Sequence, residues 1–217
     1  MHPGEDIDLD SDTSLLKIAR STVELVNSFN EWSPTNGMCL AWPPASRVVG
    51  NVTYLLTQFQ QAANATMMNN LLPNIVNHPN SGSGCNMENS GATVAINDLL
   101  VSRHGHGATR AIRYLPNGWP QGQPVSFSNV RVKGGHLASG QAVGAGPGAQ
   151  PSWAKLTIVS TFVGAVNATV INPFTNSSTP VVVNAATSEP VALSWLEPDR
   201  FTFVTPQGIV FEIRASA

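Results

Sequence analysis

Charged residues are scarce in this chain of 217 residues, because Asp, Glu, Lys and Arg together make up 11% of it, against about 25% in an average soluble domain. The formal net charge is -2, and the only lysines are Lys17, Lys133 and Lys155. This balance excludes the basic surface of a nucleic-acid-binding protein and the high charge of a disordered polyelectrolyte. The sequence also lacks a run of about 18 apolar residues, so it predicts no membrane span.

Cysteine is nearly absent, since the chain has only Cys39 and Cys85. In an oxidising compartment the two would form a disulfide across a long loop and stabilise the fold by roughly 3–4 kcal/mol. In the cytosol they would be ordinary small apolar residues. The first 20 residues lack the basic start and apolar stretch of a signal peptide, so the leader of a secreted protein would lie outside this sequence.

Neutral polar side chains supply the polarity that charges do not, with 19 Asn, 20 Ser and 16 Thr. Four asparagines stand in N-x-Ser/Thr sequons: Asn51, Asn64, Asn167 and Asn176. These sequons predict a secreted, extracellular glycoprotein whose covalent N-glycans hydrate its surface. The alternative is an Asn-rich surface that carries no sugar.

Apolar residues recur with helical spacing in the first half of the chain. Residues 12–29 are expected to form an amphipathic helix with Ser11 or Asp12 as its N-cap. Further helices are expected from residue 45 or 52 to residue 68 and over residues 92–101, whereas Pro43 and Pro44 end a short helix at Trp42.

After residue 109 the pattern changes to alternation and β-branched runs, which predict an antiparallel β-sandwich. Residues 140–151, rich in Gly, Ala and Pro, are expected to be a flexible loop. The sequence therefore predicts an α+β fold with a helical region over residues 1–108 and a β-sandwich domain over residues 109–217. The expected strands cover residues 111–115, 125–132, 154–162, 165–171, 180–184, 191–195, 200–204 and 209–214.

Two spacings resemble metal-binding patterns, and both are incomplete. Asp8, Asp10 and Asp12 alternate as in a calcium loop, but the following Gly and the closing Glu of such a loop are missing. The alternative is that these carboxylates stabilise the N-terminus of the predicted helix, since the helix dipole favours negative charge there. His104 and His106 lie too close for a helical ligand pair, and no Cys or carboxylate cluster accompanies them. We predict neither a metal site nor a cofactor.

Glu88 is the most suggestive acid for catalysis. Glycoside hydrolysis needs two carboxyl groups that face each other across a sugar bond, and Glu88 lies in a Gly/Asn/Ser-rich stretch before a predicted helix. The alternative is a carboxylate that stabilises a helix N-terminus. No second catalytic acid is evident in the sequence.

Several segments resemble, in order and spacing, the C-terminal portion of glycoside hydrolase family 95, which includes α-L-fucosidases. The match spans residues 2–135. It rests on the following segments: His2-Pro3-Gly4, a helix with Leu16, Ala19 and Arg20, Asn36-Gly37-Met38-Cys39-Leu40-Ala41-Trp42, Leu71-Leu72-Pro73-Asn74, Asn89-Ser90-Gly91-Ala92-Thr93, Arg113-Tyr114-Leu115-Pro116-Asn117-Gly118-Trp119-Pro120 and Val130-Arg131-Val132-Lys133-Gly134-Gly135.

The resemblance implies that the helical region corresponds to the last helices of an (α/α)6 barrel, an α/α-toroid-like arrangement, and that the C-terminal β-sandwich follows. The family's general acid lies upstream of anything in this chain. Its base is the Asp of an Asp-Gly-Asn-Phe-Gly loop, and Met87 occupies that position here, with Glu88 one residue away. Met38 likewise replaces the Trp of a Gly-Trp-Ser segment. Methionine cannot accept a proton, so these residues predict a loss of catalysis unless Glu88 substitutes.

Three functions follow as hypotheses. The first is a non-catalytic, secreted structural glycoprotein whose uncovered helix faces associate with a second copy or a complementary chain. The second is part of an active α-L-fucosidase-like enzyme that acts on fucosylated glycans. The third is sugar binding without hydrolysis, with Trp32, Trp42 or Trp119 as stacking platforms, although Trp119 beside Pro120 is also typical of a core residue.

Overall fold

The computed structural model describes residues 7–28, 52–53, 56–57, 60, 86–105, 110–147, 149–174 and 178–216. The chain divides into two compact units, Met1–Leu99 and Leu100–Ala217. The sequence placed the boundary at residue 108. The observed division lies earlier because strand β1 (Val101–His104), which was expected to be the end of a helix and a loop, pairs antiparallel with β2 (Ala111–Tyr114).

In the first unit the predicted amphipathic helix is present as α1 (Thr13–Ser28). Asp12 caps it, because its carboxylate accepts a hydrogen bond from the Ser14 backbone N–H at 2.8 Å. Helix α5 (Asn86–Leu100) begins six residues before the predicted start at residue 92. An α/α toroid is not evident in the described residues. No helix among them is long and apolar enough to cross a membrane.

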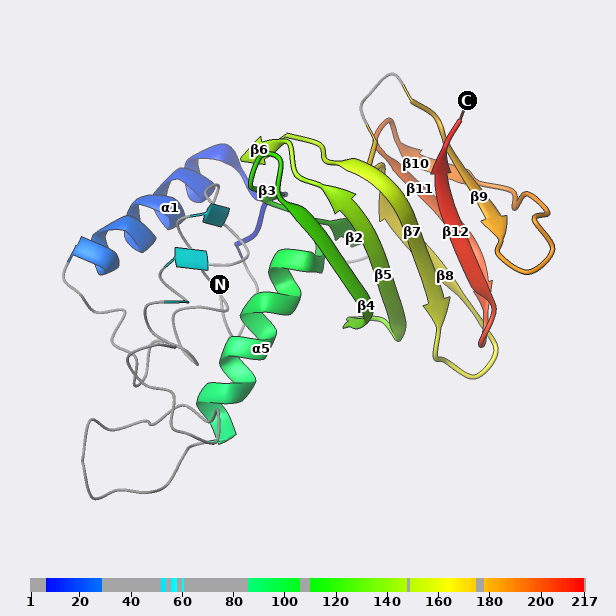
Figure 1. The fold of residues 1–217 in the computed structure, drawn as a ribbon, viewed down its shortest axis with the longest axis horizontal. Helices are drawn as coiled ribbons and strands as arrows, with labels where there is room; N and C mark the ends of the chain where they lie inside the picture. The colour runs from blue at the N-terminus through cyan, green and yellow to red at the C-terminus, as the bar shows by residue number, and fades with distance from the viewer. Residues whose placement is uncertain are drawn as a thin grey trace. The chain divides into compact units, whose positions relative to one another are not determined.

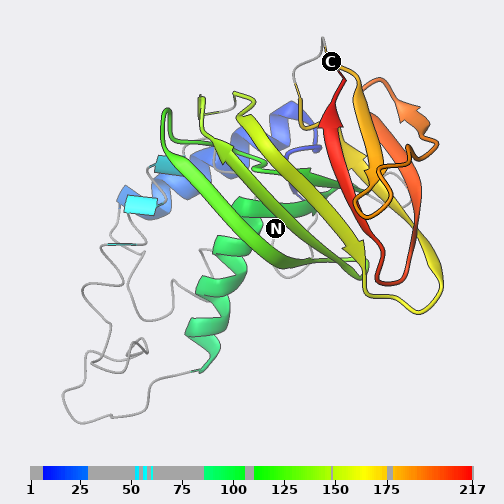
Figure 2. The ribbon, with the colours of Figure 1, turned by 45° about the vertical axis from the view of Figure 1, so that its right-hand side comes forward.

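The second unit is rich in β-structure and contains two five-stranded sheets (Figures 1 and 2). The first sheet has the order β1-β2-β8-β11-β10, and the second has the order β4-β5-β7-β12-β9. Neighbouring strands are antiparallel except β2 and β8. The remaining strands are β3 (Gly118–Trp119), β4 (Pro124–Val132), β5 (His136–Val143), β6 (Gly146–Pro147), β7 (Ser152–Ser160), β8 (Ala165–Ile171), β9 (Pro180–Asn184), β10 (Ser194–Glu197), β11 (Arg200–Pro206) and β12 (Val210–Ala215).

The two sheets pack face to face around one hydrophobic core. Alternate residues of β11 point inward, where Phe201 and Phe203 are buried. Aromatic rings connect the sheets: Phe203 of the first sheet meets Phe211 of the second at a centroid distance of 5.6 Å. Tyr114 likewise meets Trp153 edge to face at 5.9 Å. The predicted sandwich therefore has a continuous core to which both sheets contribute.

The stretch expected to be a flexible loop over residues 140–151 contains strand instead. Gly140 lies inside β5, where a Cβ atom would stand 2.7 Å from the Phe127 ring and 2.9 Å from the Trp153 ring. This glycine therefore makes room for two core aromatics rather than providing flexibility. Gly144 allows a close approach of two backbone segments, because a Cβ there would lie 2.2 Å from the Pro120 carbonyl oxygen.

Candidate functional site

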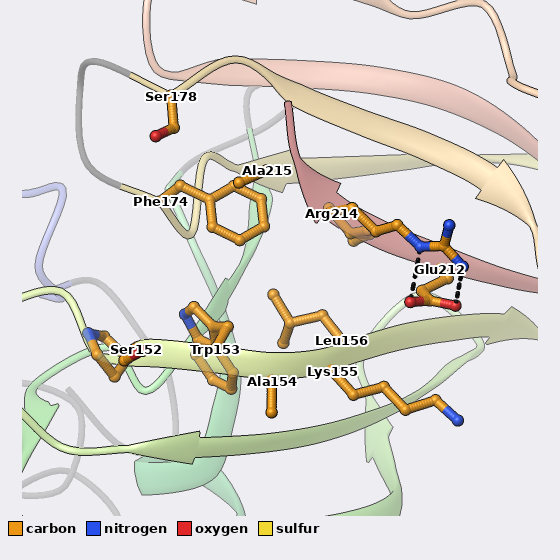
Figure 3. Close-up of a pocket in the computed structure, with 12 residues that line it drawn as sticks. Ser152, Trp153, Ala154, Lys155, Leu156, Phe174, Ser178, Glu212, Arg214 and Ala215 are labelled. Atoms are coloured by element: carbon orange, nitrogen blue, oxygen red, sulfur yellow. Dashed lines mark hydrogen bonds and ion pairs between the residues drawn. The ribbon is translucent and has the colours of Figure 1, made fainter. Parts of the chain in front are cut away.

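A hollow opens in the second sheet where β7 and β12 separate. The two strands pair only over three positions, and the last pair is Thr157 with Glu212. Beyond it β12 continues to pair with β9, whereas β7 continues to pair with β5. The resulting gap has a volume of about 310 Å³. Its lining, of which Figure 3 labels ten residues, consists of Pro151, Ser152, Trp153, Ala154, Lys155, Leu156, Phe174, Ser178, Glu212, Ile213, Arg214 and Ala215.

One end of the hollow is aromatic. The indole of Trp153 is held in place by its Nε1–H, which donates to the Pro173 carbonyl oxygen at 3.1 Å, and by its contact with Tyr114. Phe174 packs against the core from the β8–β9 connection and lies on the same side of the hollow as Trp153 (Figure 3). Both rings therefore have positions set by the sandwich core.

Asn172 holds the segment that carries Phe174. Its side-chain oxygen accepts the Phe174 N–H at 3.1 Å, and its side-chain nitrogen donates to the Ser178 carbonyl oxygen at 3.2 Å. The Asn172 backbone N–H donates to the Asp199 carbonyl oxygen at 2.7 Å. These bonds tie the β8–β9 connection, which bounds the hollow, to the turn between β10 and β11.

The other end of the hollow is charged. Arg214 makes two parallel hydrogen bonds to Glu212, each of 2.8 Å, from Nε to Oε1 and from Nη2 to Oε2 (Figure 3). These bonds lower the pKa of Glu212, and the positive charges of Arg214 and Lys155 lower it further. The same pair raises the pKa of Arg214. The hollow thus carries two positive charges and one negative charge at neutral pH.

The hollow does not have the arrangement of a glycosidase site. Glu212 is the only acid among the residues that line it, and Arg214 keeps it ionised. Glu197 and Asp199 do not line the hollow; they are exposed and lie 3.2 and 3.8 Å from the Nε of Arg200. Among the described residues of the sandwich, no second carboxyl group faces Glu212 across the gap, so this hollow lacks the acid pair that glycoside hydrolysis requires.

Most of the residues singled out from the sequence lie outside the described residues. These are Asn51, Asn64, Asn176, Met38, Cys39, Cys85, Trp32, Trp42 and His106. Glu88 is the third residue of α5, and the structure does not describe its side chain. Asn167 lies in β8 with an exposed side chain and pairs with Val204 of β11. The structure therefore tests neither the disulfide nor the glycosylation of any of the four sequons.

The acidic and histidine patterns have structural roles where they are described. The Asp8 carboxylate accepts the Asp10 N–H at 2.9 Å, and hydrogen bonds from Ser14 lower the pKa of Asp12. His104 is buried in β1 beside the Ser102 hydroxyl. No group of three or more metal-ligating side chains suited to hold an ion occurs in the described part of the chain. Trp119 packs against the sandwich core, as the structural interpretation of this residue expected.

The sequence reasoning missed the hollow, although it predicted strands over residues 154–162 and 209–214. The alternation of Glu212 and Arg214 is visible in the sequence, but the point where β7 and β12 stop pairing is not. Comparison with known proteins adds no assignment, because no protein-family model and no curated protein matches the chain.

A second polar feature of the sandwich is His136, which is only 3% exposed. The Thr205 hydroxyl donates to the Val166 carbonyl oxygen at 2.7 Å, so it accepts from Nε2–H of His136 at 3.1 Å. Nδ1 is buried and has no hydrogen-bond partner in the described structure. Burial and the nearby charge of Arg103 lower the pKa of His136 below its ordinary value of 6.5.

This histidine predicts a loss of stability in mild acid. Below about pH 6.5 the unfolded chain binds a proton at residue 136, whereas the folded chain resists it, so acid favours unfolding. Substitution His136→Gln keeps an N–H donor for Thr205 but removes the titration. We expect the melting temperature of the variant to fall less between pH 7.0 and 5.5 than that of the wild type. Identical pH profiles in calorimetry would contradict this assignment.

Proposed function

We propose that this chain is a non-catalytic, secreted glycoprotein with a structural role, and that it associates with a second copy of itself. In this proposal it is similar to the C-terminal portion of a family 95 glycoside hydrolase. Helices α1 and α5 then belong to a partial α/α toroid, and the β-rich unit corresponds to the family's C-terminal sandwich. The resemblance and the β-rich fold support this reading together.

The observation that carries the proposal is an apolar stripe on α1. Leu15, Ile18 and Leu25 are 45%, 61% and 56% exposed. With Thr22 they follow the spacing of three and four residues that forms the seam between two paired helices. The neighbouring stripe contains Ala19, which is buried at 2% exposure. Among the described residues, the apolar arc of α1 therefore extends beyond the side of the helix that contains the buried Ala19.

A second copy suits this stripe better than a charged partner does. In a helix pair built on Leu15, Ile18, Thr22 and Leu25, the positions beside the seam include Ser14, Ser21 and Ala19. None of them is charged, so two identical stripes meet without like-charge repulsion. The same patch on both subunits gives a closed, two-fold dimer.

Association predicts that the wild type is a dimer in size-exclusion chromatography with light scattering. Substitution Ile18→Glu places a charge in the seam, and we expect the dimer dissociation constant to rise at least about tenfold, because burial of one such side chain stabilises by about 1.5–3 kcal/mol. The matched control is Val204→Glu on β11, where the valine is 52% exposed, and we expect it to leave the dimer intact. A monomeric wild type, or equal effects of the two variants, would overturn the proposal.

If the chain is glycosylated, protein secreted from eukaryotic cells should have a heterogeneous intact mass. Treatment with an N-glycosidase should reduce this distribution to a single mass close to that of the polypeptide. Because Asn167 is exposed on β8, Asn167→Gln should remove the mass of one glycan. Asn184→Gln, at an asparagine outside any sequon, should change the mass only by the substitution itself. A wild-type mass that equals the polypeptide mass argues against a glycoprotein.

Catalysis is the alternative, and the proposal predicts its absence. The wild type should release no product from an aryl α-L-fucoside above the buffer rate, because Met87 has no group that accepts a proton. The variant Glu88→Gln should behave identically. Turnover by the wild type that disappears in Glu88→Gln would instead identify Glu88 as a catalytic acid or base and the chain as part of an enzyme.

A further inference from the structure

The walls of the hollow between β7 and β12 present backbone groups that do not pair with another strand of the described residues. Residues 152–156 of β7 are paired with β5 on one side only, and residues 213–215 of β12 are paired with β9 on one side only. Their remaining N–H and C=O groups face the gap as a mixture of donors and acceptors. A hydroxyl group both donates and accepts, so a ligand rich in hydroxyls matches such walls.

The aromatic end of the hollow suits the apolar face of a sugar ring. Trp153 is fixed by its hydrogen bond to Pro173, and Phe174 is fixed through Asn172. Fixed rings bind without losing side-chain freedom, and the C–H face of a pyranose packs on an aromatic surface. The volume of about 310 Å³ is at the lower limit of about 300 Å³ for small-molecule pockets. It therefore suits one sugar unit, with further units extending into solvent.

The charged end adds a requirement for an acidic group. Glu212 is neutralised by Arg214, whereas the Lys155 ammonium acts on Glu212 only through its charge and makes no direct hydrogen bond or ion pair with any of the described side chains. Nη1 of Arg214 also donates to none of them, since only Nε and Nη2 bind Glu212. Both donors lie on the side of the hollow opposite the aromatic rings (Figure 3). A carboxylate on the bound ring would satisfy them, whereas a neutral sugar would leave them unused.

We propose that this hollow binds a uronic acid unit of an acidic polysaccharide, with its ring against Trp153 and Phe174 and its carboxylate at Lys155. This site lies in the sandwich and does not depend on the association of α1. It also differs from the tryptophans that the sequence suggested as stacking platforms. It requires no catalytic group, in agreement with the single acid in the hollow.

The test is titration of the full chain with trigalacturonate, with binding measured by isothermal titration calorimetry and saturation-transfer NMR. Maltotriose, a neutral trisaccharide, and inorganic sulfate, a simple anion, are the comparison probes. We expect binding of trigalacturonate, weakening as salt is raised from 50 to 500 mM, and much weaker binding of the other two. Lys155→Gln should raise the dissociation constant at least about tenfold. The control Lys17→Gln, a cation of α1, should leave it unchanged.

Four results would overturn the proposal: no binding of trigalacturonate at millimolar concentration, equal binding of maltotriose, equal competition by sulfate, or equal losses in the two lysine variants. Equal competition by sulfate would identify a simple anion site. Lys155 is exposed, so its substitution should preserve the fold, which circular dichroism checks. The substitution Phe174→Leu provides a second measure, because it removes the ring while keeping an apolar contact with the core. It should weaken binding without changing the salt dependence.

Discussion

Burial of aromatic side chains between two sheets is the interaction on which the rest of the second unit depends. Phe203 and Phe211 meet across the sheets, and Tyr114 meets Trp153. The position of Trp153 requires a glycine at residue 140, since a Cβ there would run into the Phe127 and Trp153 rings. Gly140 of β5 is thus a condition of close packing at this point, and apolar burial between the sheets is the main favourable term of the fold.

The hollow exists because β12 pairs with β7 and with β9 over different lengths. Strand β12 separates from β7 after three paired positions but remains paired with β9, so the second sheet splits between β7 and β12. The core that holds the sheets together also fixes Trp153 at the edge of this split, and Asn172 holds Phe174 there. The candidate site therefore combines two fixed aromatic side chains with strand edges that still have hydrogen-bonding capacity.

Because charged residues are scarce in this chain, the few ionic groups have a large effect on the local electrostatic potential. Only 11% of the residues are charged, and three of them, Lys155, Glu212 and Arg214, gather at one end of the hollow. The internal pairing of Glu212 with Arg214 leaves a net positive charge there. On a surface that is otherwise hydrated by neutral Asn, Ser and Thr, one such cluster determines which ligands are attracted.

The sequence by itself determined the local elements: the periodicity of residues 12–29 predicted α1 and its Asp12 cap, and alternation after residue 109 predicted most strands of a β-rich unit. Only the tertiary structure decided that residues 136–143 form a strand, that β1 joins the sandwich, and that β7 and β12 separate beside Glu212. Local patterns record which side of a strand is buried. They carry no information about which distant strand pairs with a given strand. The hollow exists only because β12 pairs with β9 and not with β7 beyond Glu212.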